Sequence, residues 1–514
     1  MTKKILSLIS ALLLPLSPLL PAAELAGTGP INLGSRHELF IDDYLVESVH
    51  GLTWKMHEPR KAEVALQFDA PWEGNNCHYV SVFKDGEKYR MYYRAVAGKD
   101  APASGVGWRD FVCMAESDDG IKWRRPNLGL YEFEGSKQNN IILMNDEATH
   151  NFVAFRDDNS AAPPSERYKA VGGGRQGLFG YVSPDGVHWR RLSEQRLITN
   201  GYFDSQNLAF WDPVRQQYWA YVRGFYQRPG SGEGIRGIRV ATSKDFIHWT
   251  DTERIDLGDS PAEHFYTNAI TPYFRAPHIM VGFPMRLLPQ RQAELPREFD
   301  LLRGEGVSDS VFMSSRDGRK WDRRFLEAWV RPGLGALNWT DRSNAVAAGV
   351  VPTGPDEISI YLVEHVRLPT AHLRRLTLRP DGFVSLNAPA AGGEVVTKPF
   401  VFQGSQLLVN FATSAAGSLR VEILDEAGQP IPGFALKDSA DLFGDSVQQR
   451  VNWDNQGWDV GQSWPKDTNR IVARLDQNRR QANLGWSVKQ LAGQTVRLRF
   501  VLKDADLFAF QFKE

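Results

Sequence analysis

Short runs of alternating apolar and polar residues, separated by turns that contain Gly and Asp, fill most of the chain between residues 79 and 386. In the first group, Tyr79–Phe83 and Tyr89–Arg94 flank the turn Lys84-Asp85-Gly86, and Val112–Glu116 follows. Alternation with a period of two is typical of a half-buried β-strand, and Asp-Gly between two strands favours a tight hairpin. Long helical periodicity is absent from this sequence region. We therefore predict an all-β fold.

A seven-residue motif recurs along the same region. Its four complete copies are Ser117–Trp123, Ser183–Trp189, Ser243–Trp249 and Ser315–Trp321, and a degenerate fifth copy is Arg379–Phe383. The shared aspartates are 66, 60, 72 and 64 residues apart, about the length of one supersecondary unit, at Asp119, Asp185, Asp245, Asp317 and Asp381. An Asp carboxylate can accept backbone N–H bonds, Gly supplies a positive φ, and Trp can pack between units. We interpret the motif as scaffold rather than active site.

Each repeat also contains the strands that such a turn would join. In the third and fourth repeats these are Asn207–Trp211, Tyr218–Val222 and Arg239–Thr242, then Asn268–Tyr273, Ile279–Phe283 and Val311–Ser314. The fifth would use Asn344–Val351, Ile358–Val363, Leu373–Leu378 and Phe383–Leu386. Four short strands per unit predict a five-bladed β-propeller over residues 24–392. The segment Glu38–Leu45 is expected to help close the ring.

The pattern changes after the Ala- and Gly-rich stretch Ala388–Gly393. Longer alternating runs follow at Gln406–Thr413, Leu419–Asp425, Thr495–Lys503 and Leu507–Phe512. They predict a separate C-terminal β-sandwich, an accessory domain over residues 393–514. The insert between its strands carries Trp453, Trp458, Trp464 and Trp486. A domain that packs against and stabilises the propeller is the preferred interpretation, and an independent sugar-binding module is the alternative.

The first 23 residues have the features of a secretory signal peptide. Lys3 and Lys4 precede an apolar run that Pro15 and Pro18 interrupt, and a small-residue cleavage site ends at Ala23. A membrane anchor, the alternative, needs about 20 uninterrupted apolar residues. The mature protein is therefore predicted to be periplasmic or extracellular.

Composition narrows the possible partners. The chain has 514 residues, with 60 Lys and Arg against 61 Asp and Glu, and this balance argues against nucleic acid as a partner. No later segment is apolar for long enough to span a membrane. Cys77 and Cys113 are predicted not to form a disulfide, because a third strand separates the two predicted strands that carry them. The sequence contains no P-loop, H-E-x-x-H, C-x-x-C or G-x-S-x-G motif. Oligomeric state stays open.

Residues just before the first strand of each blade should converge on the central funnel of a propeller. Four of them are carboxylates, namely Glu73, Asp204, Glu263 and Asp341. Cleavage of a glycosidic bond needs one carboxylic acid to protonate the leaving oxygen and one carboxylate to activate water or attack the anomeric carbon. The polar side chains beside them suit sugar hydroxyls, and Trp72 suits a sugar face. These predicted substrate-binding residues are Trp72, His78, His150, Asn151, Gln206, Asn207, His264, Asn268 and Arg342.

A chain with a signal peptide, five such repeats and a C-terminal sandwich resembles the five-bladed β-propeller glycoside hydrolases of families 43 and 32. The stretches Glu38–Leu45 and Asp69–Gly74 also resemble a secreted bacterial group related to them. Asp204, which precedes Trp211-Asp212-Pro213, stands about where these families have their Arg-Asp-Pro aspartate, and Glu263 about where they have the acid. The resemblance implies carbohydrate metabolism, with Glu263 as general acid and Asp204 as base or orienting carboxylate. Asp341 and Glu73 compete for the remaining role.

The chain departs from those families in the second blade. His150-Asn151 stands where a carboxylate is expected, with Asp146 and Glu147 slightly upstream, so a retaining or an inverting mechanism stays open. The resemblance also implies no required cofactor, although Ca²⁺ in the central channel is found in several relatives. Arg342 could take a sulfate or carboxylate on the sugar.

Two other functions fit the same pattern. A non-catalytic glycan-binding propeller would use the polar ring and Trp72. A glycoside phosphorylase would need converging cations, for which Arg275, Arg286 and Arg342 are candidates that the predicted strands do not bring together. A hydrolase differs from both in requiring two carboxyl groups about 5–5.5 Å apart for retention or about 6.5–9.5 Å apart for inversion. The sugar, the linkage and exo or endo action stay open.

Overall fold

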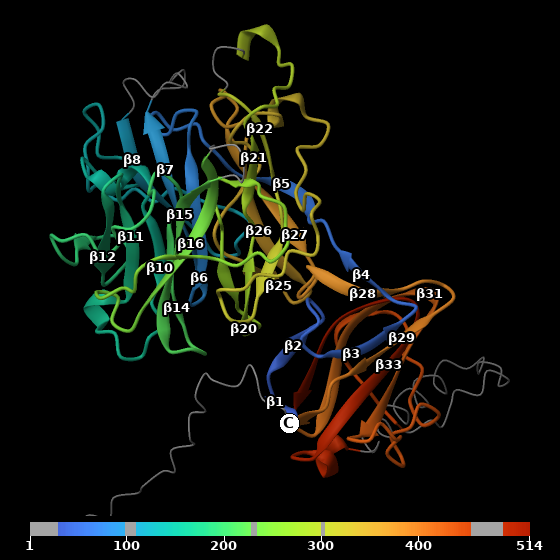
Figure 1. Cartoon of the computed structure of the whole chain (residues 1–514). Coiled ribbons are helices and arrows are strands. Elements are labelled where there is room, and N and C mark those ends of the chain that lie inside the picture. Colours follow the sequence, from blue (N-terminus) through green and yellow to red (C-terminus); the bar gives the residue numbers. More distant parts are fainter. Residues whose placement is uncertain (1–28, 98–108, 228–233, 300–303, 454–486) are drawn as a thin grey trace, which may run out of the picture.

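The protein is all-β, as predicted. Its structure, a computed structural model, describes residues 29–97, 109–227, 234–299, 304–453 and 487–514, so the predicted signal peptide lies outside the described residues. Helical segments in this part of the chain are short 3₁₀ turns, η1 (Glu147–His150), η2 (Pro164–Glu166), η3 (Arg297–Phe299), η4 (Ala336–Asn338) and η5 (Val488–Leu491). Figure 1 shows the small sheets in one part of the molecule and one large sheet in the other.

Three four-stranded antiparallel sheets follow one another along the chain and are referred to as units 1 to 3. Unit 1 comprises β6 (His78–Asp85), β7 (Lys88–Ala97), β8 (Arg109–Ser117) and β9 (Ile141–Met144). Unit 2 comprises β10 (Val153–Arg156), β11 (Tyr168–Gly174), β12 (Gly177–Ser183) and β13 (Arg190–Arg191). Unit 3 comprises β14 (Leu208–Asp212), β15 (Gln217–Gln227), β16 (Gly234–Ser243) and β17 (Glu253–Arg254). The predicted strands of the first and third repeats lie within these sheets.

Unit 4 is divided into two three-stranded sheets. They contain β18 (His264–Phe265), β21 (Met285–Leu288) and β22 (Val307–Ser310), and β19 (Thr271–Tyr273), β20 (Ala276–Gly282) and β23 (Met313–Ser315). Pro284 lies between β20 and β21, where it has no N–H to donate to a continuous ladder. The break in unit 4 therefore falls at a residue that cannot extend the sheet.

Unit 5 takes one strand from the N-terminal side of the chain. It comprises β24 (Ala345–Val346), β25 (Val351–Gly354), β26 (Glu357–Glu364), β27 (His372–Leu378) and β5 (Arg60–Gln67). β5 pairs with β27 through Gln67 opposite His372 and Arg60 opposite Thr377. The predicted fourth strand, Phe383–Leu386, instead overlaps β28 (Val384–Ala388) of the large sheet. An alternating pattern fits either sheet, so the sequence did not distinguish these partners.

The repeated motif forms the predicted turns. In the second copy, Oδ1 of Asp185 accepts the backbone N–H of Val187 at 2.8 Å and of His188 at 2.9 Å, and the Trp189 indole donates to the Gly186 carbonyl. Gly186 has φ +76°, and in the third copy Phe246 takes this position with φ +67°. The aspartates are thus occupied as backbone acceptors, which supports their interpretation as scaffold.

Each turn packs on the preceding unit, and the first turn packs on the last unit. The Tyr92 hydroxyl of unit 1 donates to Gly186 at 2.9 Å, and the Tyr221 hydroxyl of unit 3 donates to Gly318 at 2.8 Å. Trp123 of the first turn lies against Tyr361 of unit 5, with ring centroids 5.6 Å apart. A parallel bridge also joins Ser81 of β6 to Ala348, which follows β24. The contacts between units therefore run from the first to the fifth and back to the first.

The large sheet contains strands from both ends of the described chain. They are β1 (Ile31–Gly34), β2 (His37–Leu39), β3 (Val46–His50), β4 (Thr53–Met56), β28, β29 (Gly393–Thr397), β30 (Phe400–Phe402), β31 (Gln406–Asp425), β32 (Asp445–Arg450) and β33 (Thr495–Lys513). The predicted pairs of C-terminal runs merge into β31 and β33, and the pairing register of these two strands shifts between Thr413 and Ser418. Trp453 is buried in the core of this sheet, whereas Trp458, Trp464 and Trp486 lie outside the described residues.

The segment Glu38–Leu45 differs from its predicted role. Its first residues belong to β2, which pairs with β33, and Phe40 and Leu45 pack in the core of the large sheet. Residues 31–56 thus pair with C-terminal strands, although the predicted propeller boundary placed them with the repeats. Burial of Phe40 and Leu45 favours this position, which an alternating pattern cannot specify.

Two buried acids join the large sheet to unit 4. Glu38 accepts from Arg316, with Oε2 2.9 Å from Nη1, and lies 3.1 Å from the ring of His278. Asp381, from the degenerate fifth motif, binds His37 at 2.8 Å and Tyr273 at 2.9 Å. Burial raises the pKa of Asp381, but His37 and other donors outweigh it and lower the pKa to about 2. The fifth motif is therefore an inter-sheet anchor rather than a hairpin turn.

Candidate functional site

The predicted ring of amides is buried and binds the main chain. Asn207 donates to the carbonyls of Phe203 and Ser205 at 2.8 and 2.9 Å, and Gln206 donates across to Val80 of unit 1 at 2.8 Å. Asn151 donates to Phe203, and Asn268 to Gln206 and Tyr221. The donors of these four side chains are thus occupied by main-chain carbonyls. In this structure Asn151, Gln206 and Asn268 join neighbouring units, Asn207 binds its own segment, and none of the four directs its N–H donors to a ligand.

Glu73 and Trp72 belong to the packing of unit 1. Glu73 is fully buried and accepts from the Tyr93 hydroxyl at 2.6 Å and from Nε and Nη2 of Arg125, both at 2.8 Å. Trp72 donates to Asn140 at 2.8 Å and lies edge-on to Phe133. Hydrogen bonds thus occupy both oxygens of Glu73, and Trp72 shows the contacts of a packing residue.

Asp204 and His150 are brought together. The ring of His150, at the end of η1, lies between two carboxylates, with Nε2 3.0 Å from Oδ1 of Asp204 and Nδ1 3.0 Å from Oδ2 of Asp110. Arg94 of β7 donates to the other oxygen of Asp110 at 2.9 Å. The Asp204 side chain is 52% exposed, more than any other carboxylate among the four predicted ones. The Asp204 carboxylate can therefore contact a ligand while His150, which Asp110 orients, holds its position.

The surroundings of this pair favour ionised carboxylates. The His150 hydrogen bond, followed by the charges of His150 and Arg223, holds the pKa of Asp204 well below its usual range despite burial. Burial raises the pKa of Asp110, but the His150 hydrogen bond and Arg94 outweigh it and lower the pKa. An ionised carboxylate is what a base or a nucleophile requires.

Asp341 and Arg342 lie in the same cluster. Oδ2 of Asp341 accepts from Arg342 and, at 2.9 Å, from Nη1 of Arg367. His78 places Nε2 3.2 Å from the Arg342 carbonyl, and burial lowers the pKa of His78 to about 3. Asp341 is 3% exposed, so its charge is neutralised by arginines rather than presented to solvent.

Tyr266 of unit 4 occupies the middle of this cluster. Nε of Arg342 donates to its hydroxyl at 3.0 Å, and the charges of Arg342 and Arg223 act on it together. Burial raises the pKa of Tyr266, but these cations and the hydrogen bond outweigh it and bring the pKa below its usual value. Tyr79 contacts the His150 ring at 5.9 Å, and burial raises the pKa of Tyr79. Two tyrosines with opposite pKa shifts thus lie in the cluster, one beside His150 and one beside Arg342.

Glu263 binds a different set of arginines from Asp204. It accepts from Nη1 of Arg286 at 3.0 Å and from Arg323. His264 accepts from the backbone and side chain of Arg236, each at 3.3 Å. Glu263 and Arg236 both line a pocket of about 450 Å³ between unit 3 and the loop that precedes β18. The pocket therefore connects Glu263 with the Arg236 side of the cluster.

The three cations considered for a phosphate do not converge. Arg275 binds Asp381 at 3.0 Å beside the large sheet, Arg286 binds Asp309 and Glu263, and Arg342 binds Asp341. Each has its own carboxylate, as the predicted strands implied.

The described residues hold no group of three or more His, Cys, Asp or Glu side chains arranged for a metal ion. Calcium takes several oxygen ligands, whereas arginines occupy Asp341, and His78 is surrounded by Arg342, Arg94 and Arg367. Ca²⁺ does not suit these side chains.

Cys77 and Cys113 are free and buried. In the part of the chain that the structure covers, no helix has the length and apolar character to cross a membrane.

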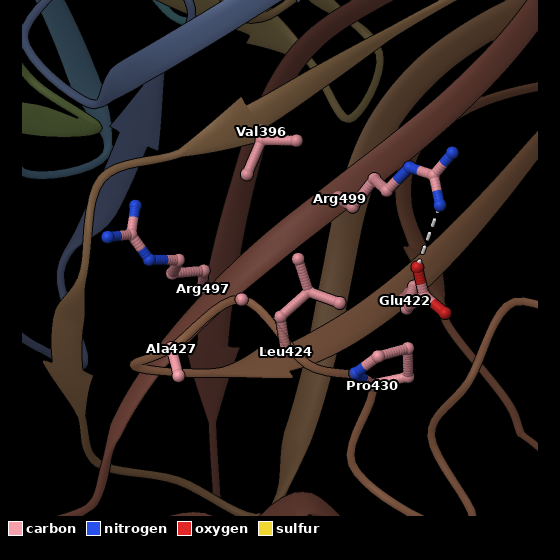
Figure 2. Close-up of a pocket in the computed structure, with 8 residues that line it drawn as sticks. Val396, Glu422, Leu424, Ala427, Pro430, Arg497 and Arg499 are labelled. Carbon is pink, nitrogen blue, oxygen red and sulfur yellow. Dashed lines mark hydrogen bonds and ion pairs between the residues drawn. The ribbon is translucent and has the colours of Figure 1, made fainter.

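A second pocket lies on the large sheet (Figure 2). Its volume is about 380 Å³, and Arg499 points towards Glu422 while Arg497 points away from it. No aromatic ring is among its lining residues in the described chain, so it offers no stacking platform for a sugar.

Sequence reasoning missed Arg94, Asp110, Arg223, Arg236 and Tyr266. A signal for two of them was present, because Tyr92-Tyr93-Arg94 and Tyr221-Val222-Arg223 repeat Tyr-x-Arg on the second strands of units 1 and 3. In both, the tyrosine binds the next turn and the arginine reaches the cluster. Tyr266 lies within the segment that supplied Glu263 and Asn268, but a tyrosine at such a position is typical of a core residue.

No family model and no curated protein matches the chain. Solved structures with a similar course include BT0996 in a complex with RGII, at 13% identity and TM-score 0.45, over 63% of this chain and 93% of that one. An N-acetylgalactosamine deacetylase from F. plautii, in complex with blood group B trisaccharide, has 12% identity and TM-score 0.41, over 64% and 96%. A glycosyl hydrolase from Bacteroides ovatus has 14% identity and TM-score 0.39, over 67% and 97%. Similarity at this level does not assign a function, so the function has to be argued from the side chains of the site.

Proposed function

We propose that the protein is a glycoside hydrolase whose five units form a five-bladed β-propeller, with the site around Asp204 at its centre. The observation that carries the proposal is the half-exposed Asp204 carboxylate, which lies among polar side chains from the five units or from the segments that lead into them. Those side chains are Arg94 and Asp110 of unit 1, His150 before unit 2, Arg223 of unit 3, Tyr266 of unit 4 and Arg342 before unit 5. Contacts that return from unit 5 to unit 1 support a closed ring.

Asp204 is proposed as the base or nucleophile. His150 donates to it from one side and Arg223 lies 3.7 Å from its second oxygen, so its ionised form is favoured. From this position Asp204 would attack the anomeric carbon or take a proton from the attacking water. Asp110 and Arg94 would act through His150, by orienting its ring.

Glu263 is proposed as the general acid, which protonates the leaving oxygen. It lies on the 450 Å³ pocket, 24% exposed at its side chain, with Arg286 and Arg323 setting its position. Arg236 lies between this pocket and the Asp204 cluster. Asp341 would position Arg342. Glu73 is left out, because its oxygens are occupied within unit 1.

The large sheet is proposed to be a β-sandwich that stabilises the propeller through Glu38 and Asp381. Export by the N-terminal segment, and hence a periplasmic or extracellular location, remains a prediction from residues 1–23.

Product analysis tests the proposed activity. The purified full chain would be incubated with plant and algal polysaccharides and oligosaccharides, with and without inorganic phosphate, and the products separated by mass spectrometry. A hydrolase releases a free reducing sugar at a rate that phosphate does not alter. Formation of a sugar 1-phosphate would contradict hydrolysis in favour of phosphorolysis, and binding without any product would favour a lectin.

A further inference from the structure

Among the residues that the structure describes, positive charge exceeds negative charge in the cluster beside Asp204. Arg342 and Arg367 share the single carboxylate of Asp341, and Arg223 has Asp204 as its only carboxylate within the described ranges, at 3.7 Å. Arg236 forms no ion pair with any residue that the structure describes. Because Arg94 and Asp110 compensate each other, four arginines remain against two aspartates, one of which also binds His150.

Three of these guanidinium groups surround one ring. The central carbons of Arg342, Arg223 and Arg236 lie 5.0, 5.6 and 5.8 Å from the centroid of Tyr266. They come from three different segments, namely the start of unit 5, β15 and β16. Arg223 and Arg236 lie on paired strands of one hairpin, whereas Arg342 comes from a distant part of the sequence and is brought to them by the fold.

Some polar atoms of this cluster are buried without a partner. Nε of Arg236, Nε of Arg367 and Nδ1 of His78 find no hydrogen-bond partner among the described residues. Burial, then Arg223 and Arg342, lower the pKa of Arg236, which shows that its surroundings disfavour its charge. Cations crowded together with too few counter-charges destabilise a fold, so this arrangement indicates a ligand anion that supplies the missing negative charge.

We propose that Arg223, Arg236 and Arg342 form a subsite for an oxyanion carried by the glycan, such as the carboxylate of a uronic acid or a sulfate ester. This inference rests on the proposed function, since it places the anionic group next to Asp204. Guanidinium groups bind carboxylates and sulfates through paired N–H donors and have no acceptor to offer a neutral sugar. The substrate would therefore be an acidic glycan.

Matched pairs of glycans test this subsite. Acidic oligosaccharides from pectin and glucuronoxylan would be compared with their carboxyl-reduced forms, and sulfated algal oligosaccharides with their desulfated forms, by titration calorimetry on the full chain. We expect one acidic member to bind at least about 10-fold more tightly than its neutral counterpart. Arg236→Gln should lower that affinity about 10-fold and leave the neutral counterpart unchanged.

Two further variants separate charge, geometry and folding. Arg236→Lys keeps the charge but loses the planar fork, so it should restore only part of the affinity. Arg124→Gln removes an exposed arginine that binds Asp118 at a distant turn, and it should bind every glycan as the wild type does. Thermal unfolding of each variant shows whether it is folded.

The outcomes distinguish this subsite from the proposed activity. Cleavage of a neutral glycan as rapidly as its acidic partner, unchanged in Arg236→Gln, would overturn the subsite and leave the hydrolase intact. Binding of an acidic glycan that is never cleaved, and is lost in Arg236→Gln, would support the subsite and contradict the hydrolase. Inorganic phosphate that binds at the same arginines and enters the product would overturn a glycan as the source of the oxyanion.

Discussion

Nε2 of His150 lies 3.0 Å from Oδ1 of Asp204, and Nδ1 of the same ring lies 3.0 Å from Asp110. The ring can donate to both carboxylates only when both nitrogens carry hydrogen. Asp204 is therefore oriented by a group that Asp110 and Arg94 position in turn. This chain of contacts joins units 1, 2 and 3 at the point where the ligand is expected.

The pH profile should depend on His150. Its hydrogen bond is the largest cause that lowers the pKa of Asp204, so the acid limb of kcat/KM in the wild type should lie below the ordinary Asp value of about 4. In His150→Gln the pKa of Asp204 rises, and the acid limb should move to higher pH. Rates measured between about pH 3 and pH 8 check this. A limb at the same pH in both proteins would show that Asp204 is not the titrating base.

Glu263→Gln separates an acid from a structural residue. If Glu263 is the general acid, Glu263→Gln should lower kcat on natural glycans about 10²–10⁴-fold. The loss should be much smaller on aryl glycosides, because an acidic phenol leaves without protonation. Glu194→Gln, at a side chain 92% exposed, is the matched control. An equal loss on both substrate types would instead indicate that Glu263 only maintains Arg286 and Arg323.

Asp381 should make stability depend on pH. Its pKa is about 2 in the folded protein and about 3.9 in an unfolded chain, so its ionised form contributes stability that is present above about pH 4. This contribution is lost as the pH falls towards 2. Asp381→Asn should cost about 2 kcal/mol of unfolding free energy at pH 7 and much less near pH 2. Denaturant unfolding at both pH values measures it, with exposed Asp356→Asn as the control. A cost that does not depend on pH would contradict the assignment.

Ring closure should appear as coupling between Trp123 and Tyr361. Their rings lie 5.6 Å apart and edge-on, although they belong to the first turn and the fifth unit. A double-mutant cycle with Trp123→Leu and Tyr361→Leu should give a coupling of about 1 kcal/mol in unfolding free energy. Trp249→Leu with Tyr361→Leu should be additive, because Trp249 packs on Phe246 in unit 3. Additivity of the Trp123 pair would contradict contact between units 1 and 5.

The strands and turns of the repeats could be predicted because their causes are local. Asp185 accepts N–H groups two and three residues ahead, and Gly186 supplies the positive φ, so the motif itself specifies the turn. The sequence could not predict that unit 5 takes β5 in place of β28. Apolar and polar residues alternate in both strands, and only the register in the complete fold distinguishes them.

The site was predictable only in part. Asp204, His150 and Arg342 lie in one cluster because each precedes a first strand, which the repeat locates, and their role in a site stays a prediction. Their position before a first strand predicted that Asn207 and Gln206 face a ligand. In the structure their side-chain N–H groups donate to buried main-chain carbonyls instead. Arg223 and Arg236 lie within β15 and β16, and only the three-dimensional arrangement shows that they share Tyr266.

Asp204→Asn on a glycan that the wild type cleaves is the most direct test of the central claim. The substitution keeps the size of the side chain and removes its charge. We predict that kcat falls at least about 10³-fold while thermal unfolding and glycan binding change little. Hydrolysis within a few fold of the wild-type rate would contradict Asp204 as the catalytic carboxylate and, with it, the proposed site.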